Sequence, residues 1–130
     1  MEVKQNNLID SLKIQPLIVL IRLEYEFFNI PKKKDNLLLK IEKLSNYGIK
    51  NIEIGWDSNP EWVNLISEIK INFKSINIGA ASISSELSLE SILELDLNYS
   101  MSPLFKKEIH IKAIKYNQLV IPGISNIEDF

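Results

Sequence analysis

The sequence predicts an α/β fold built around a parallel β-sheet. The chain has 130 residues, of which 45% are hydrophobic and 25% are charged, and this is an ordinary composition for one globular domain with its own core. Short apolar runs alternate with longer amphipathic runs, a pattern typical of strands joined by helices through right-handed crossovers. No linker composition or low-complexity segment interrupts the pattern, so residues 1–130 are expected to form a single domain.

Five short runs are predicted to be strands, because they are mostly apolar or β-branched and are bounded by polar, Gly or Pro positions. They are Leu17–Arg22, Ile49–Trp56, Ile76–Ser82, Leu97–Pro103 and Gln118–Gly123. Amphipathic runs between them, and one run before the first of them, are predicted to be helices. These runs are Asn7–Ile14, Asp35–Gly48, Pro60–Phe73, Ser88–Asp96 and Leu104–Asn117. The expected order is a helix followed by four strand–helix pairs and a fifth strand.

The last residues have the pattern of a new helix. Ser125 and Glu128 have the spacing of a capping box, in which the Ser side chain and the Glu side chain satisfy each other's backbone N–H groups. The sequence stops two residues later, at Phe130, and a single turn cannot offset the cost of starting a helix. We therefore expect this turn to open an element that the 130 residues do not complete.

Charge and composition exclude several classes of function. The formal net charge is −2, and the only basic cluster is Lys32–Lys34, so a nucleic-acid or anionic membrane partner is not expected. The chain has no Cys, and its apolar runs are too short to span a bilayer or to form a leader peptide. A cytoplasmic location is expected. The segment after the first predicted strand contains no Gly, which disfavours a phosphate-binding turn for a nucleotide.

Histidine and tryptophan offer little sign of a catalytic site. His110 is the only histidine and lies in a predicted helix, so no metal site is expected and a surface or groove position is favoured. Trp56 and Trp62 flank the turn after the second predicted strand. Packing between helix and sheet is the expected role of these rings, and a lid over a site is the alternative.

Glu53 stands out because it lies in the middle of a predicted strand. Alternation places Ile52 and Ile54 on one face, toward the helices, and Glu53 on the other. A carboxylate in the interior of a curled sheet is costly to desolvate unless it is paired or used, and burial raises its pKa toward the range that proton transfer needs. Two interpretations of Glu53 stay open: it is a proton-shuttling carboxyl, or it is a structural carboxylate paired with Arg22.

Other candidate residues lie where the predicted strands end. Arg22 closes the first strand, Ser82 the third and Pro103 the fourth, and Gly123 follows the fifth. The carboxyl ends of parallel strands share one edge of the sheet, and ligands bind there in open α/β sheets and barrels alike. A guanidinium, a hydroxyl and a carboxyl at this edge would suit a small oxo-acid. The alternative is that Ser, Pro and Gly stand there because chains turn there.

Five motifs in order give the sequence a family resemblance. They are PLIVLIR, GIKNIEIGW, NIGAASISSELSLESI, NYSMSP and VIPGIS, and together they extend from about Leu8 to the last residue. The chain resembles the class I aldolases that cleave 2-keto-3-deoxy-6-phosphogluconate (KDPG) and 4-hydroxy-2-oxoglutarate (KHG). The resemblance implies the N-terminal portion of a (β/α)8 barrel of the TIM type, in a family that is usually trimeric.

The resemblance also implies roles for particular residues. Glu53 matches the family's proton-shuttling glutamate, Arg22 its substrate-binding arginine and Pro103 its active-site proline. Ser82 stands where the family has a threonine that holds the carboxylate of pyruvate. In the family a lysine forms a Schiff base with pyruvate, and the imine accepts the electrons of the broken carbon–carbon bond. No cofactor or metal is expected.

The sequence departs from the family pattern at informative places. Trp56-Asp57-Ser58 replaces the family's Leu-Arg-Thr, so a cation gives way to a negative charge. Ala81 replaces the second glycine of the family's Gly-Ala-Gly-Thr segment, which adds a methyl group beside the expected ligand. The family's Schiff-base lysine and phosphate-binding loops have no match in the 130 residues, and Lys112 and Lys115 fall on a predicted helix.

These departures leave three hypotheses open. The chain is the N-terminal portion of an aldolase that is catalytically incomplete by itself, a short protein that binds an oxo-acid or a partner without catalysis, or one half of a split enzyme whose other chain supplies the lysine. A homo-oligomer or a complementing chain is the expected partner, because a sheet cut after its fifth strand leaves unpaired edges.

Overall fold

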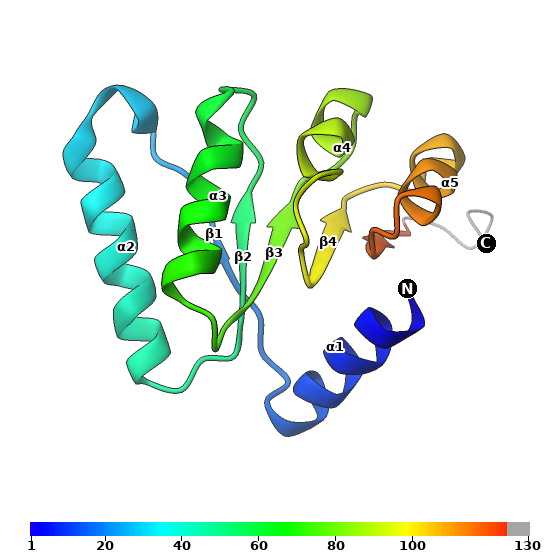
Figure 1. Ribbon diagram of the computed structural model, residues 1–130, viewed down its shortest axis with the longest axis horizontal. Coiled ribbons are helices and arrows are strands. Elements are labelled where there is room, and N and C mark those ends of the chain that lie inside the picture. Colours follow the sequence, from blue (N-terminus) through cyan, green and yellow to red (C-terminus); the bar gives the residue numbers. More distant parts are fainter. Residues whose placement is uncertain (125–130) are drawn as a thin grey trace.

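The computed structural model describes residues 1–124 and contains one five-stranded sheet, in which every neighbouring pair is parallel and the order is β1-β2-β3-β4-β5 (Figure 1). The strands are β1 (Val19–Ile21), β2 (Asn51–Gly55), β3 (Asn77–Ala81), β4 (Tyr99–Ser102) and β5 (Val120–Pro122). The helices are α1 (Glu2–Ile14), α2 (Pro31–Asn46), α3 (Glu61–Asn72), α4 (Glu86–Ile92) and α5 (Lys107–Lys115), with a short 3₁₀ helix η1 (Phe27–Asn29). The predicted alternation of strands and helices is confirmed. Within residues 1–124 the sheet does not close on itself.

The five predicted strands and the five helices predicted before or between them all exist, but several of their bounds were wrong. The strands are shorter than predicted, and β1 has three residues. Helix α1 begins at Glu2 and α2 at Pro31, where proline occupies the first turn and needs no hydrogen-bond partner for its nitrogen. Helix α4 begins before Ser88, because Ser85 caps it. The helix expected at Ser125 lies outside the described residues.

The core lies between one face of the sheet and the helices α2 to α5. Ile52 and Ile54 of β2 are fully buried on this face, as their alternation with Glu53 predicted. Each of the four helices contributes buried apolar side chains to the same cluster, namely Leu37 and Ile41, Trp62, Leu65, Ile66 and Ile69, Leu89 and Ile92, and Ile109 and Ala113. This packing fixes the strands and leaves the opposite face for polar side chains such as Glu53.

Helix α1 lies at the edge of the sheet where the strands begin (Figure 1). Hydrogen bonds join it to a row of asparagines: the Ser11 hydroxyl donates to Asn51 Oδ1 over 3.1 Å, Asn77 Nδ2 donates to the same oxygen over 2.9 Å, and Asn98 Nδ2 donates to Asn77 Oδ1 over 3.3 Å. The row ties the starts of β2, β3 and β4 to one another and to α1. In residues 1–124 no helix, α1 included, has both the length and the apolar character to cross a bilayer.

Candidate functional site

Glu53 lies in the middle of a row of residues that crosses the sheet. In the parallel register Leu20 of β1 pairs with Glu53, Glu53 pairs with Gly79 of β3, and Gly79 pairs with Tyr99 of β4. Because paired residues point to the same side, the Glu53 and Tyr99 side chains share one face, with only the hydrogen of Gly79 between them. Glu53 is 8% exposed and Tyr99 is fully buried, so the row places a carboxyl and a phenol together out of water.

The environment of Glu53 changes its acidity. Burial raises the pKa of Glu53 above its ordinary value of 4.5, while the Tyr99 hydroxyl and the attraction of Arg22 lower the pKa in part. Burial and the negative charge of Glu53 raise the pKa of the Tyr99 hydroxyl far above its ordinary value, so the phenol keeps its proton. The net result is a carboxyl that holds its proton more tightly than an exposed one, beside a phenol that keeps its proton and can donate it in a hydrogen bond to the carboxylate.

The carboxyl and the phenol face each other without a formed hydrogen bond. Glu53 Oε2 and the Tyr99 hydroxyl oxygen are both buried, and neither has a hydrogen-bond partner among the described residues. The register nevertheless brings them near each other, because the far end of the Tyr99 ring lies over Gly79, the residue that pairs with Glu53. The pair is therefore two facing polar groups, each with unused hydrogen-bonding capacity.

Arg22 and Ser82 meet where β1 and β3 end. Arg22 Nη1 lies 3.5 Å from Ser82 Oγ, at the long limit for a hydrogen bond. Gly55 ends the strand between them, and a Cβ there would stand 3.6 Å from Arg22 Cα, in ordinary contact, so the position of Arg22 does not require a glycine. Ser82 has a backbone φ of 65°, an uncommon conformation for a residue other than glycine. Within residues 1–124 Arg22 forms no ion pair with Glu53, although its charge lowers the pKa of Glu53 in part.

Pro103 stands apart from the other candidates. It is exposed after β4, and its carbonyl oxygen lies beside Gly123, which follows β5. The Gly123 N–H donates to Ser102 O over 2.7 Å, and a Cβ on Gly123 would stand 2.6 Å from Pro103 O, so only glycine permits this approach. The structure thus brings Arg22, Ser82 and Glu53 together, while Pro103 lies at the same edge of the sheet beside β5.

The tryptophans serve packing. The Trp62 ring N–H donates to Gly55 O over 2.9 Å and its side chain is buried against the core. The Trp56 ring N–H donates to Ser91 Oγ of α4 over 3.1 Å. These rings join the sheet to α3 and α4, so the expected packing role is found.

His110 and Asp57 have local partners. The His110 ring stacks on Phe105 with centroids 5.0 Å apart, and its Nδ1 lies 3.0 Å from Lys106 O. Asp57 Oδ1 accepts from the Asn59 N–H over 2.8 Å, within the turn after β2. Among residues 1–124, no three His, Cys, Asp or Glu side chains are grouped so that they could hold a metal ion.

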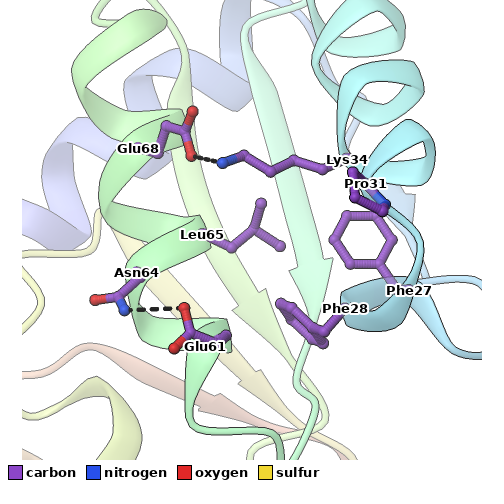
Figure 2. A pocket seen from close by; sticks show the side chains of 8 residues that line it. All are labelled: Phe27, Phe28, Pro31, Lys34, Glu61, Asn64, Leu65 and Glu68. Atoms are coloured by element: carbon purple, nitrogen blue, oxygen red, sulfur yellow. Dashed lines mark hydrogen bonds and ion pairs between the residues drawn. The ribbon is translucent and has the colours of Figure 1, made fainter.

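A hollow on the helical side of the molecule is separate from these residues. Figure 2 shows it between η1 with the start of α2 on one side and α3 on the other, where Lys34 pairs with Glu68 over 2.6 Å. Its volume is about 260 Å³, and Phe27, Phe28 and Leu65 give it apolar walls. It contains none of the candidate site residues Arg22, Glu53, Ser82 and Pro103.

Sequence reasoning missed Tyr99. The residue lies in a predicted strand, and its relation to Glu53 depends on Gly79 of the strand between them. The relation could have been predicted only from the alignment of the strands with one another: in neighbouring parallel strands that begin at the same level, Glu53, Gly79 and Tyr99 fall in one row. Alternation within each strand, taken separately, could not reveal it.

Comparisons with known proteins support the fold. No protein-family model matches the chain, and no curated protein matches it. A native KDPGal structure aligns with a TM-score of 0.69 and 20% identity, over 88% of this chain and 52% of that chain. The KDPG aldolase from Legionella pneumophila, with pyruvate captured at low pH as a covalent carbinolamine intermediate, aligns with a TM-score of 0.71 and 19% identity, over 88% of this chain and 51% of that chain.

A third similar structure is a cube-shaped, highly porous protein cage designed by fusing symmetric oligomeric domains, with a TM-score of 0.67, 18% identity, and coverage of 86% of this chain and 38% of that chain. The chain spans about half the length of the first two structures. The likeness in fold to KDPG aldolases that the motifs predicted is confirmed. The five-stranded sheet corresponds to part of that barrel.

Proposed function

We propose that the chain carries the substrate-binding and proton-transferring part of a class I aldolase that releases pyruvate and an aldehyde from a 2-oxo acid. The observation that supports this most is the meeting of Arg22 and Ser82 beside the buried Glu53. Arg22 and Ser82 follow the ends of β1 and β3, and Glu53 lies two residues before the end of β2. In a fold similar to that of KDPG aldolases, the strand ends are where barrel enzymes bind their substrates.

In this proposal Arg22 and Ser82 hold the carboxylate of the substrate. A guanidinium can donate two parallel hydrogen bonds to a carboxylate, and charge-assisted bonds of this kind are about twice as strong as neutral ones. The Ser82 hydroxyl, 3.5 Å from the guanidinium, adds a third donor in the same direction. Pro103 would bound the site on the side of β4.

Glu53 moves the protons. A lysine amine condenses with the C2 carbonyl and releases water, and the C3–C4 bond then breaks with its electron pair passing to the imine nitrogen. Glu53 takes the proton of the C4 hydroxyl as the aldehyde leaves, and returns a proton to C3 of the resulting enamine. Water then hydrolyses the imine to pyruvate and the free amine. The raised pKa of Glu53 suits a group that must both accept and return a proton.

The lysine has to come from outside the described sheet. None of the strands β1 to β5 contains Lys. The proposal therefore includes further residues or a complementing chain that supplies the amine, within a homo-oligomer such as the trimer that the resemblance implies. A cytoplasmic location is part of the same proposal.

Asp57 bears on the choice of substrate. It stands after β2 where the resemblance leads one to expect an arginine, and its carboxylate is held in the turn by the Asn59 N–H. A negative charge there disfavours a second anionic group on the substrate. A 4-hydroxy-2-oxo acid or a sugar acid without phosphate is therefore the proposed substrate class.

Binding of pyruvate to the isotopically labelled chain, followed by NMR, tests the proposal. Saturable amide shifts are expected at the ends of β1, β2 and β3. Arg22→Met should weaken pyruvate binding about tenfold or more, because a charge-assisted hydrogen bond contributes about 1.5–3 kcal/mol. Ser82→Ala should weaken binding by a smaller factor.

Lys32→Met is the matched control, because it removes one exposed positive charge from α2 without touching the strand ends. It should leave pyruvate binding unchanged. Equal binding by wild type and Arg22→Met, or no saturable binding at about 50 mM pyruvate, would overturn the proposal.

One observation supports a non-catalytic alternative: the described strands contain no Lys. Under that reading the chain binds an oxo-acid through Arg22 and Ser82 and performs no cleavage. An enzyme-coupled assay for pyruvate release from a 4-hydroxy-2-oxo acid separates the two functions, provided that it is run on the chain in its natural assembly. Pyruvate binding without pyruvate release there would favour the binding protein.

A further inference from the structure

The row formed by Glu53, Gly79 and Tyr99 has a geometry that depends on the middle residue. A Cβ built on Gly79 would stand 2.5 Å from Cζ of Tyr99, 2.6 Å from Cε2 and 2.8 Å from Cε1. The far end of the phenol ring, which carries the hydroxyl, therefore lies directly over Gly79. Tyr99 starts on β4, passes over β3, and brings its hydroxyl toward Glu53 on β2.

We propose that Tyr99 is a positioning residue for Glu53, and that its hydroxyl donates a hydrogen bond to the Glu53 carboxylate and holds it at one place above β2. That Glu53 then transfers protons rests on the proposed function, but the hydrogen bond itself does not. The resemblance assigns no role to Tyr99, and its part follows from the register and from the close approach to Gly79.

Two buried atoms with unused bonding capacity support the assignment. Glu53 Oε2 and the Tyr99 hydroxyl oxygen each have no partner among residues 1–124, although both are out of water. Leaving a buried polar group unsatisfied costs about 1–3 kcal/mol, and more when the group is charged. A small rotation of the Glu53 side chain that closes this pair removes both costs.

The surroundings of Glu53 give the hydroxyl a distinct task. Among the described residues, the charged and titratable groups that act on Glu53 are Arg22 after β1 and Tyr99 on β4, while β3 contributes only Gly79. Arg22 also lies beside Ser82, where a substrate carboxylate would compete for its charge. Tyr99 would then be the group that continues to stabilise the Glu53 carboxylate when the site is filled.

Removing the hydroxyl should therefore change the titration of Glu53. Burial raises the pKa of Glu53, and the Tyr99 hydroxyl lowers it by a smaller amount. Without the hydroxyl, less remains to counteract the effect of burial on this pKa. In Tyr99→Phe the ring still covers Gly79 and the core is unchanged, so the variant should fold. We expect the pKa of Glu53 to rise in this variant, and fewer Glu53 side chains to be ionised at a given pH.

The experiment is a carboxyl ¹³C NMR titration of Glu53 in wild type, Tyr99→Phe and the control Tyr47→Phe. Tyr47 is 86% exposed beyond the end of α2, so its hydroxyl should have no effect on Glu53. An upward shift of the Glu53 titration in Tyr99→Phe alone supports the proposal. An unchanged or lowered Glu53 pKa in Tyr99→Phe overturns it, as does an equal shift in both variants.

This measurement needs no ligand, so its result is separable from that of pyruvate binding. If pyruvate fails to bind while Tyr99→Phe raises the pKa of Glu53, the positioning role stands and the proposed function falls. If pyruvate binds through Arg22 while the Glu53 titration is unaffected by Tyr99→Phe, the positioning role falls and the proposed function stands.

Discussion

The phenol ring of Tyr99 lies over Gly79 so closely that no other residue fits beneath it. A methyl group on Gly79 would stand 2.5 Å from the ring, well inside van der Waals contact, and its neighbour here is a ring fixed in a fully buried position. The glycine is thus required by a side chain from the next strand and not by a turn. The relationship defines the candidate site, because it sets where the phenol can point.

Gly79→Ala should destabilise the chain. The added methyl group forces Tyr99 off its position over β3, and overpacking of a well-packed interior costs about 1–3 kcal/mol. Urea unfolding, followed by circular dichroism, should show a lower midpoint with an unchanged slope.

Gly55→Ala is the matched control for that substitution. Gly55 lies one strand away on the same face, but a Cβ there would meet its neighbours at 3.6–3.7 Å, which is ordinary contact. It should cost clearly less than Gly79→Ala. Equal unfolding free energies for Gly79→Ala and wild type would show that Tyr99 does not cover Gly79.

The stability of Glu53→Gln relative to wild type should increase as the pH rises. Burial raises the pKa of Glu53 in the folded chain above 4.5, so the folded state favours the protonated carboxyl. The favourable contribution is fully present below the unfolded pKa and is lost as the pH rises through the folded pKa. Glutamine does not titrate, so the variant should gain on wild type as the pH rises from about 4 to about 8.

Unfolding free energies at several pH values measure this difference between the variant and wild type. Glu108→Gln serves as the control for loss of one negative charge, because Glu108 is exposed on α5. An advantage of Glu53→Gln that is constant with pH, or that shrinks as the pH rises, would contradict the raised pKa.

The fold could be predicted from the sequence because its signals are local. Alternation in β2 put Ile52 and Ile54 toward the helices, as found, and the amphipathic run Pro60–Phe73 predicted a helix where α3 lies. Such patterns need only the period of one element. The motifs at the strand ends predicted the likeness to KDPG aldolases in the same way, since each belongs to a single strand and the turn after it.

The parts that could not be predicted depend on contacts between elements. Tyr99 reaches Glu53 only because β2, β3 and β4 share one register and Gly79 lies between them. The start of α4 was missed for a different reason: Ser85 caps the helix with Ser88 as its reciprocal partner, whereas the usual pattern has Glu or Gln at that position. The Ser88 hydroxyl can accept from the N–H of the capping residue as Glu or Gln does, but the usual capping-box pattern does not include Ser at this position.

Ser85→Ala should test this cap. The Ser88 N–H donates to Ser85 Oγ over 3.1 Å, and the Ser85 N–H donates to Ser88 Oγ over 2.9 Å. Loss of a Ser cap costs about 1 kcal/mol, and α4 has only seven residues with which to offset it. Ser84→Ala is the neighbouring control, because the Ser84 hydroxyl forms no hydrogen bond in residues 1–124. Similar unfolding midpoints for the two variants would argue against the reciprocal cap.

Treatment with pyruvate and borohydride should leave no reduced adduct on the 130-residue chain by itself. A Schiff base needs an amine that is held unprotonated beside the bound oxo-acid, usually by desolvation or by a neighbouring cation. The described strands contain no Lys, and Lys112 on α5 instead pairs with Glu90 over 3.4 Å. The KDPG aldolase from Legionella pneumophila, which has been captured with pyruvate as a covalent intermediate, is the positive control for trapping, read by intact mass.

A stoichiometric mass increase on this chain would contradict the expectation, and peptide mapping would then identify the lysine. A modified lysine on α5 would place the amine on the helical side, away from Arg22 and Ser82, and would require a second oxo-acid site. A modified Lys106 would have another meaning, because its ammonium already donates to Ser84 O over 2.7 Å near the end of β3. The amine would then come from within the described residues, and the proposal that other residues supply it would be wrong.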